Sequence, residues 1–244
     1  MQLAEFLPSQ PSRLWHLAKQ MNVNYAVSGL PWEEKTEKPW DLMPLIRMKQ
    51  RYADFGLTLS VIESMPPSNK IKLGIPGRDE EIEIFQQFLV NMGAAGIPVL
   101  CYNFMAQFNW FRTSTTTRTR GGALVSSYDH SLMADAPLTE AGIVTEEQLW
   151  ENLHYFLEKI VPVAESARVK LALHPDDPPI TPIRGVSRIC GTRRRCSGPS
   201  IWCRARTAAL RCARGRWRRP ERISRESFGI SPISRSCSSS TSAT

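Results

Sequence analysis

Apolar positions along the first 190 residues alternate between short continuous runs and longer stretches with helical spacing. The short runs are Val23–Val27, Leu57–Glu63, Ile97–Phe104 and Val169–His174. The longer stretches occupy residues 39–55, 78–92 and 145–167. A short β-branched or apolar run bounded by Gly or Pro favours a strand, whereas apolar residues three and four apart favour a helix. The pattern therefore predicts strands and helices in regular alternation.

Each helical stretch has an apolar face, and two of the three stretches begin with residues that favour a helix N-terminus. In residues 39–55 the positions near helical spacing are Leu42, Leu45, Ile46, Lys49 and Tyr52. In residues 78–92 the face consists of Ile82, Phe85, Phe88, Leu89 and Met92, and four acidic residues crowd the first turns, where the helix dipole favours them. Thr145, followed by Glu147 and Gln148, is typical of a helix start.

Regular alternation of this kind implies parallel strands joined by right-handed crossovers. Units of roughly 40–60 residues suit an α/β fold of the (β/α)8 TIM barrel type with enlarged loops. The pattern provides about four βα units, so we expect an incomplete barrel. A long loop, rich in Thr and Gly, is expected from about Arg112 to Thr139.

Charge and cysteine divide the chain at about residue 190. The formal net charge is +8, but residues 188–244 hold fourteen arginines, two glutamates and no lysine, so the preceding residues are net acidic. Five of the six cysteines also lie in this segment. It offers too few large apolar side chains to offset a chain entropy of roughly 1–2 kcal/mol per residue. We expect a partial barrel in residues 1–189 and a disordered or non-native tail in residues 190–244.

Two explanations of the tail remain open. Its dominant residues are those that GC-rich codons encode in a shifted frame, which favours a frameshift near Cys190–Arg193. The alternative is a genuine Arg-rich tail that binds nucleic acid through its charge. Such tails usually use lysine as well and rarely carry five cysteines, so we expect no nucleic-acid partner.

Composition of the first 187 residues is typical of a soluble enzyme. No stretch reaches the roughly 18 apolar residues that a membrane helix needs, so no membrane partner is expected. The opening MQLAEFLPSQPSRLW lacks a basic start followed by an apolar run, so no secretory signal is expected. A single cysteine here, Cys101, fits a reducing cytoplasm and reads as an inert buried thiol.

The strongest chemical signal is LALHPDDPP, in which His174 ends a predicted strand. In βα barrels the C-terminal ends of the strands are where catalytic and metal-binding groups gather. Neutral imidazole is a common ligand of divalent transition metals, and Asp176 and Asp177 would orient such a site or hold its loop. The alternative is a strand-end histidine that the main chain satisfies.

Other polar residues follow the neighbouring strands. Glu63 and Asn103 end the second and third predicted strands, and Arg112 lies just beyond. We expect the polar groups at the three successive strand ends, Glu63, Asn103 and His174, to converge on one mouth, where an arginine fork such as that of Arg112 would suit a carboxylate substrate. His130, in the long loop, is a further candidate for substrate binding. The alternatives are loop caps for Glu63 and Asn103 and solvated surface groups for the other two.

Remaining candidates carry little chemistry. His16 and His154 fall on predicted helices as structural or solvent-facing groups. The pair Gly121–Gly122 is too weak for a phosphate loop, and neither a dinucleotide-binding nor a nucleophile-elbow motif occurs.

Four motifs carry a resemblance to a known family. VIES, CYNFM, ALHPDDPP and PIRG occur in order at residues 61–64, 101–105, 172–179 and 182–185. With their surroundings they resemble the mannonate dehydratases, xylose-isomerase-like barrels, over nearly all of residues 1–190. The resemblance implies a hydro-lyase that converts D-mannonate to 2-keto-3-deoxy-D-gluconate in hexuronate (glucuronate) catabolism, with Mn²⁺ or Fe²⁺ as cofactor.

The resemblance also implies roles for particular residues. It makes His174 a metal ligand and places Glu63, Asn103 and Arg112 near the substrate. Family members continue after PIRG with a CQG-type segment that carries a Cys ligand, and later segments resembling HFRDV and DHVP supply further ligands and acid/base groups. None is present here, so the catalytic acid and base are not assigned and this chain is expected to be inactive or poorly folded.

Two further inferences stay open. A homo-oligomer is compatible with the family, although no interface is indicated. A sugar isomerase or epimerase on the same barrel is the alternative enzyme, and a carboxylate-rich set of metal ligands would distinguish it from the dehydratase.

Overall fold

The computed structural model describes residues 2–35, 37–133, 135–191 and 208–210, all within one compact unit, residues 1–213. The helices are α1 (Arg13–Gln20), α2 (Leu42–Asp54), α3 (Asn69–Leu73), α4 (Arg78–Ala94) and α5 (Glu146–Ser166), with short 3-10 turns η1 (Arg120–Gly122) and η2 (His130–Met133). The strands are β1 (Ala4–Phe6), β2 (Tyr25–Ser28), β3 (Thr58–Ile62), β4 (Val99–Asn103), β5 (Ser114–Arg118), β6 (Leu124–Ser127), β7 (Lys170–His174) and β8 (Ala208–Leu210). Within these ranges, no helix combines the length and the apolar character that crossing a membrane requires.

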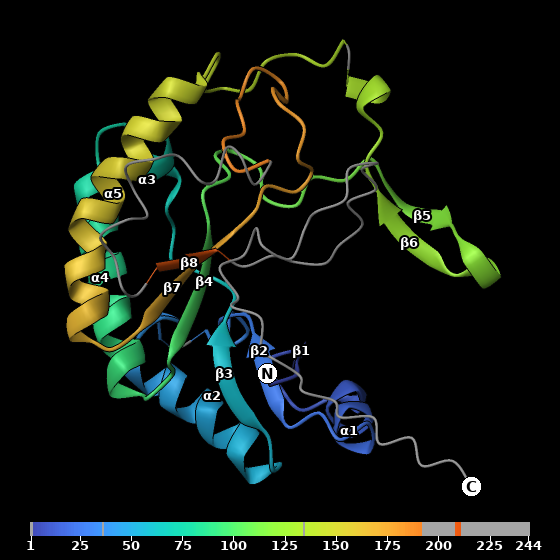
Figure 1. Cartoon of the computed structure of the whole chain (residues 1–244), viewed down its shortest axis with the longest axis vertical. Helices are drawn as coiled ribbons and strands as arrows, with labels where there is room; N and C mark the ends of the chain where they lie inside the picture. The colour runs from blue at the N-terminus through green and yellow to red at the C-terminus, as the bar shows by residue number, and fades with distance from the viewer. Residues whose placement is uncertain (1, 36, 134, 192–207, 211–244) are drawn as a thin grey trace, which may run out of the picture. The chain divides into compact units, whose positions relative to one another are not determined.

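The main sheet is parallel throughout. Its order is β1–β2–β3–β4–β7–β8, and each neighbouring pair runs in the same direction. Parallel neighbours need crossovers, and helices α1, α2, α4 and α5 lie in the connections between the first five strands. This succession of four βα units and a fifth strand confirms the predicted incomplete TIM barrel. Figure 1 shows α3, α4 and α5 side by side along one flank of the strands.

Helices α4 and α5 form where the sequence places them. Helix α4 begins at Arg78, as predicted, and all five residues of its predicted apolar face are buried. Helix α5 begins with a complete capping box at Thr145. The Thr145 hydroxyl accepts a hydrogen bond from the Gln148 N–H at 3.3 Å, and the Gln148 side chain accepts from the Thr145 N–H at 2.9 Å. These bonds satisfy main-chain donors that the helix itself leaves without acceptors.

Several features differ from the sequence-based expectation. Ile46, one of the positions near helical spacing, is 39% exposed, because α2 turns Leu45, Met48 and Tyr52 to the core instead. The expected long loop contains an antiparallel hairpin of β5 and β6, which Figure 1 shows projecting away from the sheet. Its turn places Gly121 and Gly122 at φ values of 70° and 78°, which glycine adopts without strain.

Two short elements were not predicted from the sequence pattern. Strand β1 has three residues and α3 has five, too few for either periodicity to show. The predicted tail falls mostly outside the described residues. Of it, the structure describes 190–191 and β8, whose residues pair in parallel with Leu171, Ala172 and Leu173 of β7.

Side-chain alternation on β4 separates the helix-facing layer from the barrel interior. Tyr102 lies against α5, with its ring centroid 5.9 Å from that of Phe156. Because successive side chains of a strand point to opposite faces, Cys101 and Asn103 point to the other side. The register pairs Cys101 with Ala172 and Asn103 with His174. Neighbouring residues in register share a face, so Asn103 and His174 both project into the barrel interior.

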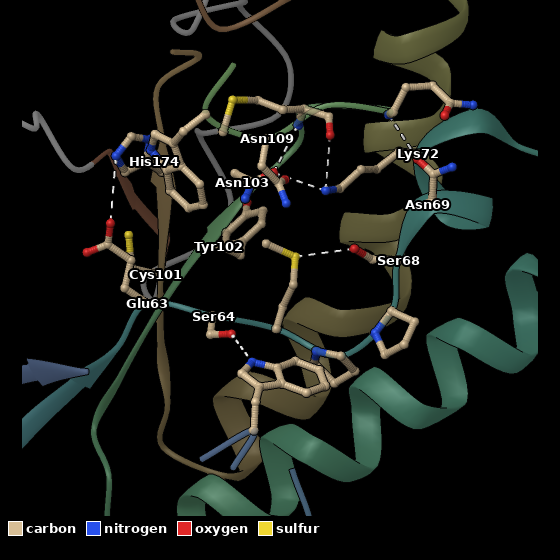
Figure 2. A pocket seen from close by; sticks show the side chains of 17 residues that line it. Glu63, Ser64, Ser68, Asn69, Lys72, Cys101, Tyr102, Asn103, Asn109 and His174 are labelled. Atoms are coloured by element: carbon tan, nitrogen blue, oxygen red, sulfur yellow. Dashed lines mark hydrogen bonds and ion pairs between the residues drawn. The ribbon is translucent and has the colours of Figure 1, made fainter. Parts of the chain in front are cut away.

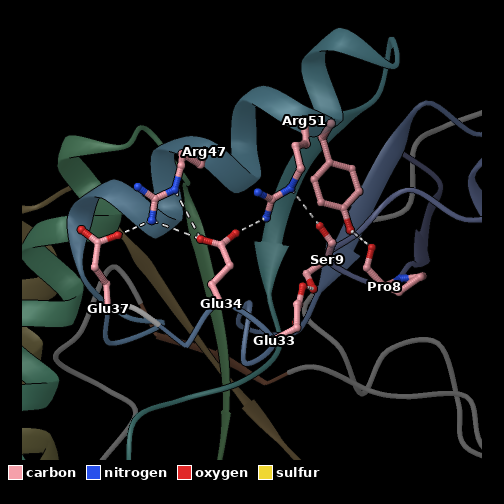
Figure 3. A network of polar contacts seen from close by, with 8 residues as sticks. Pro8, Ser9, Glu33, Glu34, Glu37, Arg47 and Arg51 are labelled. Carbon is pink, nitrogen blue, oxygen red and sulfur yellow. Dashed lines mark hydrogen bonds and ion pairs between the residues drawn. The ribbon is translucent and has the colours of Figure 1, made fainter.

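Ion pairs fix the loop between β2 and α2 (Figure 3). Glu34 forms ion pairs with Arg47 at 3.1 Å and with Arg51 at 2.7 Å, and Glu37 also pairs with Arg47. Arg51 donates in addition to the main-chain oxygen of Ser9 at 3.3 Å. The pairs are partly exposed, so each contributes at most about 1 kcal/mol. Together they hold a loop that carries Trp32, which lines a cavity at the C-terminal ends of the strands.

Removing the capping box should weaken the fold measurably. We expect Thr145→Ala to lower the free energy of unfolding by about 1 kcal/mol, because the cap satisfies a helix N–H. Urea denaturation followed by circular dichroism measures the change. Thr115→Ala is the matched control, since Thr115 is exposed on β5 and caps no helix. Equal unfolding midpoints for the two variants would show that the capping box contributes nothing.

Candidate functional site

A cavity of about 550 Å³ lies beyond the C-terminal ends of β3, β4 and β7 (Figure 2). Each of these strands contributes a polar residue to its wall: Glu63 follows β3, Asn103 ends β4 and His174 ends β7. The three side chains predicted to converge therefore do converge. The main chain sets this arrangement, because Asn103 and His174 are register partners and the Glu63 N–H donates to the Ser28 carbonyl at 2.8 Å.

His174 is almost fully buried and presents one nitrogen toward Glu63. Its Nδ1 lies 2.6 Å from the Pro175 carbonyl oxygen, and its Nε2 lies 3.8 Å from Glu63 Oε1. A carbonyl can only accept, so the hydrogen-bond network assigns the proton to Nδ1 and leaves Nε2 as an acceptor in the neutral ring. That is the tautomer in which Nε2 can bind a metal. Trp110 packs edge-on against the ring at a centroid distance of 5.4 Å.

Glu63 and His174 fit one side of a divalent cation. Two acceptors that face each other are unfavourable unless a proton or a cation lies between them. Within the described ranges, however, no group of three or more His, Cys, Asp and Glu side chains is placed to hold a metal ion. A defined site needs three or four ligands. Glu63 and His174 alone therefore do not make a metal site, and no chemical step follows from them.

Asn103 is held by two hydrogen bonds to its side-chain oxygen. Lys72 Nζ donates to Asn103 Oδ1 at 3.0 Å, and the Met105 N–H donates to the same atom at 3.1 Å. Both partners are donors, so the network assigns the accepting end of the amide to this position. The amide NH2 of Asn103 is then the end available to a molecule in the cavity.

Lys72, on α3, is the principal residue of the wall that sequence reasoning missed. It is only 5% exposed, and its Nζ also donates to the Met105 carbonyl at 3.3 Å. Burial and, to a smaller extent, the charge of Arg188 lower the pKa of Lys72 from 10.5 to about 8, although Asp176 and Glu81 act to raise it. The sequence offered no clear signal, because Ile71 and Leu73, next to Lys72 on a helix, point to other faces and do not indicate its burial.

Arg112 does not belong to the wall. Its Nη1 and Nη2 donate to the two carboxylate oxygens of Asp177 at 3.0 and 2.6 Å. The fork that was expected to bind a substrate carboxylate thus binds a carboxylate of the chain itself. Asp176 also holds a loop, since its Oδ2 accepts from the Cys190 N–H at 2.6 Å. Of the two roles considered for these aspartates, the structure favours holding the loop after β7.

The other candidates divide between surface and wall. His130 lies on η2 and is exposed, with its Nδ1 2.8 Å from the Tyr128 hydroxyl, and it is not one of the described residues that line the cavity. His16 and His154 are exposed, as expected. Cys101 is buried and forms part of the cavity wall. Two exposed tryptophans, Trp32 and Trp110, also line the cavity, and the sequence had not singled them out.

Comparisons with known proteins agree on one family. The model of the family described as D-mannonate dehydratase (UxuA) matches residues 15–141 and 137–197. Mannonate dehydratase from Thermotoga neapolitana is 38% identical over 194 residues, which cover 67% of this chain and 54% of the relative. Mannonate dehydratase 1 from Bacillus licheniformis is 33% identical over 196 residues, covering 67% of this chain and 53% of the relative.

A solved structure supports the same relationship. The crystal structure of mannonate dehydratase from Streptococcus suis serotype 2 superposes with a TM-score of 0.71 at 32% sequence identity. The match covers 80% of this chain and 59% of that one. The chain thus spans about half the length of the curated relatives that it matches. The strand-end motifs, the parallel βα units and these matches together show that the chain belongs to the mannonate dehydratase family.

Proposed function

We propose that the protein containing this chain is a hydro-lyase that dehydrates D-mannonate to 2-keto-3-deoxy-D-gluconate in hexuronate (glucuronate) catabolism. The observation that carries the proposal is the meeting of Glu63, Asn103 and His174 on one cavity wall, within residues that match the family model. The family implies a divalent metal, and we propose Mn²⁺ or Fe²⁺, with His174 as one ligand and Glu63 beside it.

The reaction removes the C2 proton and the C3 hydroxyl of the sugar acid. A proton beside a carboxylate is weakly acidic, and a bound divalent cation would stabilise the negative charge that develops when it leaves. The residues described here orient the substrate. The NH2 of Asn103 would donate to a carboxylate or hydroxyl oxygen, and Trp110 would shield the His174 ring from water. No described residue is assigned as the general acid or base.

Arg112 and His130 have no place in this scheme. Arg112 is engaged by Asp177, and His130 contacts Tyr128 on the exposed part of the loop. A substrate role for either residue would need a rearrangement of the segment between β4 and α5, so the proposal rests on the wall residues alone.

The proposal includes an organisation for the whole chain. We propose that residues 1–189 form the partial barrel and that residues 190–244 are a tail of non-native sequence, for which a frameshift is the favoured explanation; the described part of this tail, residues 190–191 and β8, packs on the barrel. A small sugar acid is the proposed partner, the cytoplasm the proposed location, and a homo-oligomer is compatible with the family. No specific observation favours the isomerase alternative. None favours nucleic-acid binding either, since the Arg-rich tail lies almost wholly outside the described residues.

Activity should depend on ligands beyond those described. We expect the purified 244-residue chain, supplied with Mn²⁺ and D-mannonate, to turn over no faster than its His174→Ala variant, because one imidazole and one carboxylate cannot define a metal site. Formation of the 2-keto acid, followed as its semicarbazone, is the measurement. A turnover rate higher than that of the His174→Ala variant would show that this chain is active and would contradict the prediction.

A chimaera tests the dehydratase function itself. Residues 1–190 joined to the C-terminal half of the Streptococcus suis relative should dehydrate D-mannonate when Mn²⁺ is present. His174→Ala in the chimaera should lower kcat/KM by at least about 100-fold, the loss expected when a preorganised catalytic site is disrupted. His154→Ala, at an exposed helix position, is the matched control. A folded chimaera that binds Mn²⁺ but leaves D-mannonate unchanged would refute the proposal.

A further inference from the structure

We propose that Lys72 forms an anion-binding subsite in the cavity wall, where its ammonium group and the amide NH2 of Asn103 bind the carboxylate of a sugar acid. The identification of the anion as a sugar acid rests on the proposed function. The existence of an anion subsite rests on the surroundings of Lys72 alone.

The direct partners of the Lys72 ammonium group are neutral. Its Nζ donates to the amide oxygen of Asn103 and to the main-chain oxygen of Met105. An ammonium group has three N–H donors, so these two acceptors leave one N–H for another partner. In the part of the chain that the structure describes, no carboxylate lies within ion-pair distance of Lys72.

The charged groups nearest to Lys72 do not balance it fully. Glu81 and Asp176 favour the ammonium form from a distance, but Glu81 accepts from the Ile71 N–H at 3.1 Å and Asp176 from the Cys190 N–H at 2.6 Å. Arg188 acts in the opposite direction. A buried cation is costly unless it is paired. An anion that enters the cavity would supply the missing pairing.

The geometry of the wall suits a carboxylate in particular. Asn103 Oδ1 is turned toward Lys72 and the Met105 N–H, which leaves the amide NH2 as a second donor next to the ammonium group. Two adjacent donors can bind the two oxygens of one carboxylate. Figure 2 shows Glu63 and His174 on one side of the cavity and Lys72 on the other, with Asn103 between them. A cation would be repelled at the Lys72 end, so the cavity has one side for a metal and one for an anion.

Binding of small ligands to the full chain, without metal, tests the subsite. Isothermal titration calorimetry compares D-mannonate and its C2 epimer D-gluconate with D-mannitol, a neutral polyol of the same length. We expect Lys72→Met to weaken the binding of both acids by at least tenfold and to leave the affinity for D-mannitol unchanged. Lys70→Met is the matched control, because Lys70 is exposed on the same helix. Circular dichroism verifies that each variant is folded.

Several outcomes would overturn the subsite. One is that the unaltered chain binds neither acid, and another is that it binds D-mannitol as tightly as D-mannonate. A third is that Lys72→Met weakens the binding of the acids and of D-mannitol equally. Failure of the proposed function can be told apart from failure of the subsite. If D-mannonate and D-gluconate bind equally and both lose binding in Lys72→Met, the anion subsite is supported, but selectivity for D-mannonate is not.

Stability provides a second measurement that does not need a ligand. The folded pKa of Lys72 lies below the ordinary value of 10.5, so the unfolded chain binds more protons between about pH 8 and pH 10.5. The charged Lys72 therefore destabilises the fold below pH 8. Lys72→Met also removes two buried hydrogen bonds, so the informative quantity is the pH dependence of the difference between the two proteins. We expect the urea midpoint of the unaltered chain to rise relative to that of Lys72→Met between about pH 8 and pH 10.5. A difference that does not change with pH would show that the charge of Lys72 is already compensated in the fold, and would overturn the proposal.

Discussion

The parallel register between β4 and β7 is the constraint on which the site depends. It sets Asn103 opposite His174, and side-chain alternation then turns both residues into the barrel interior. A shift of one residue on either strand would send its polar group into the helix-facing layer, where Tyr102 packs against Phe156. The aromatic packing between sheet and helices therefore fixes not only the fold but also which groups line the cavity.

Behind the wall, polar contacts hold the loops that follow these strands. Asp177 binds Arg112 of the segment after β4, and Asp176 binds the main chain at Cys190. Lys72 joins α3 to the end of β4 through Asn103 and Met105. The contact between Arg112 and Asp177 pairs two opposite charges. Lys72 differs, because the acceptors that it contacts are neutral oxygens, and a buried charge without an opposite charge in contact is typical of a binding site.

Membership of the mannonate dehydratase family and the partial site are consistent with each other. The chain spans about half the length of its curated relatives, and Glu63 and His174 face each other across 3.8 Å on the cavity wall. In the proposed arrangement, this side of the cavity faces the metal and the Lys72 side faces the anion. This division suits a substrate whose carboxylate must be held while a neighbouring carbon reacts.

By itself, the sequence determined the βα alternation, the start of α4, the cap of α5 and the convergence of Glu63, Asn103 and His174, because periodicity, capping and strand ends are local properties of the chain. Only the tertiary structure decided that Arg112 is engaged by Asp177, that Ile46 faces outward and that Lys72 enters the wall. These outcomes depend on contacts such as that between Arg112 and Asp177, 65 positions apart. Spacing along the chain cannot encode such contacts, because they arise only when parallel strands bring distant loops to the same end of the sheet.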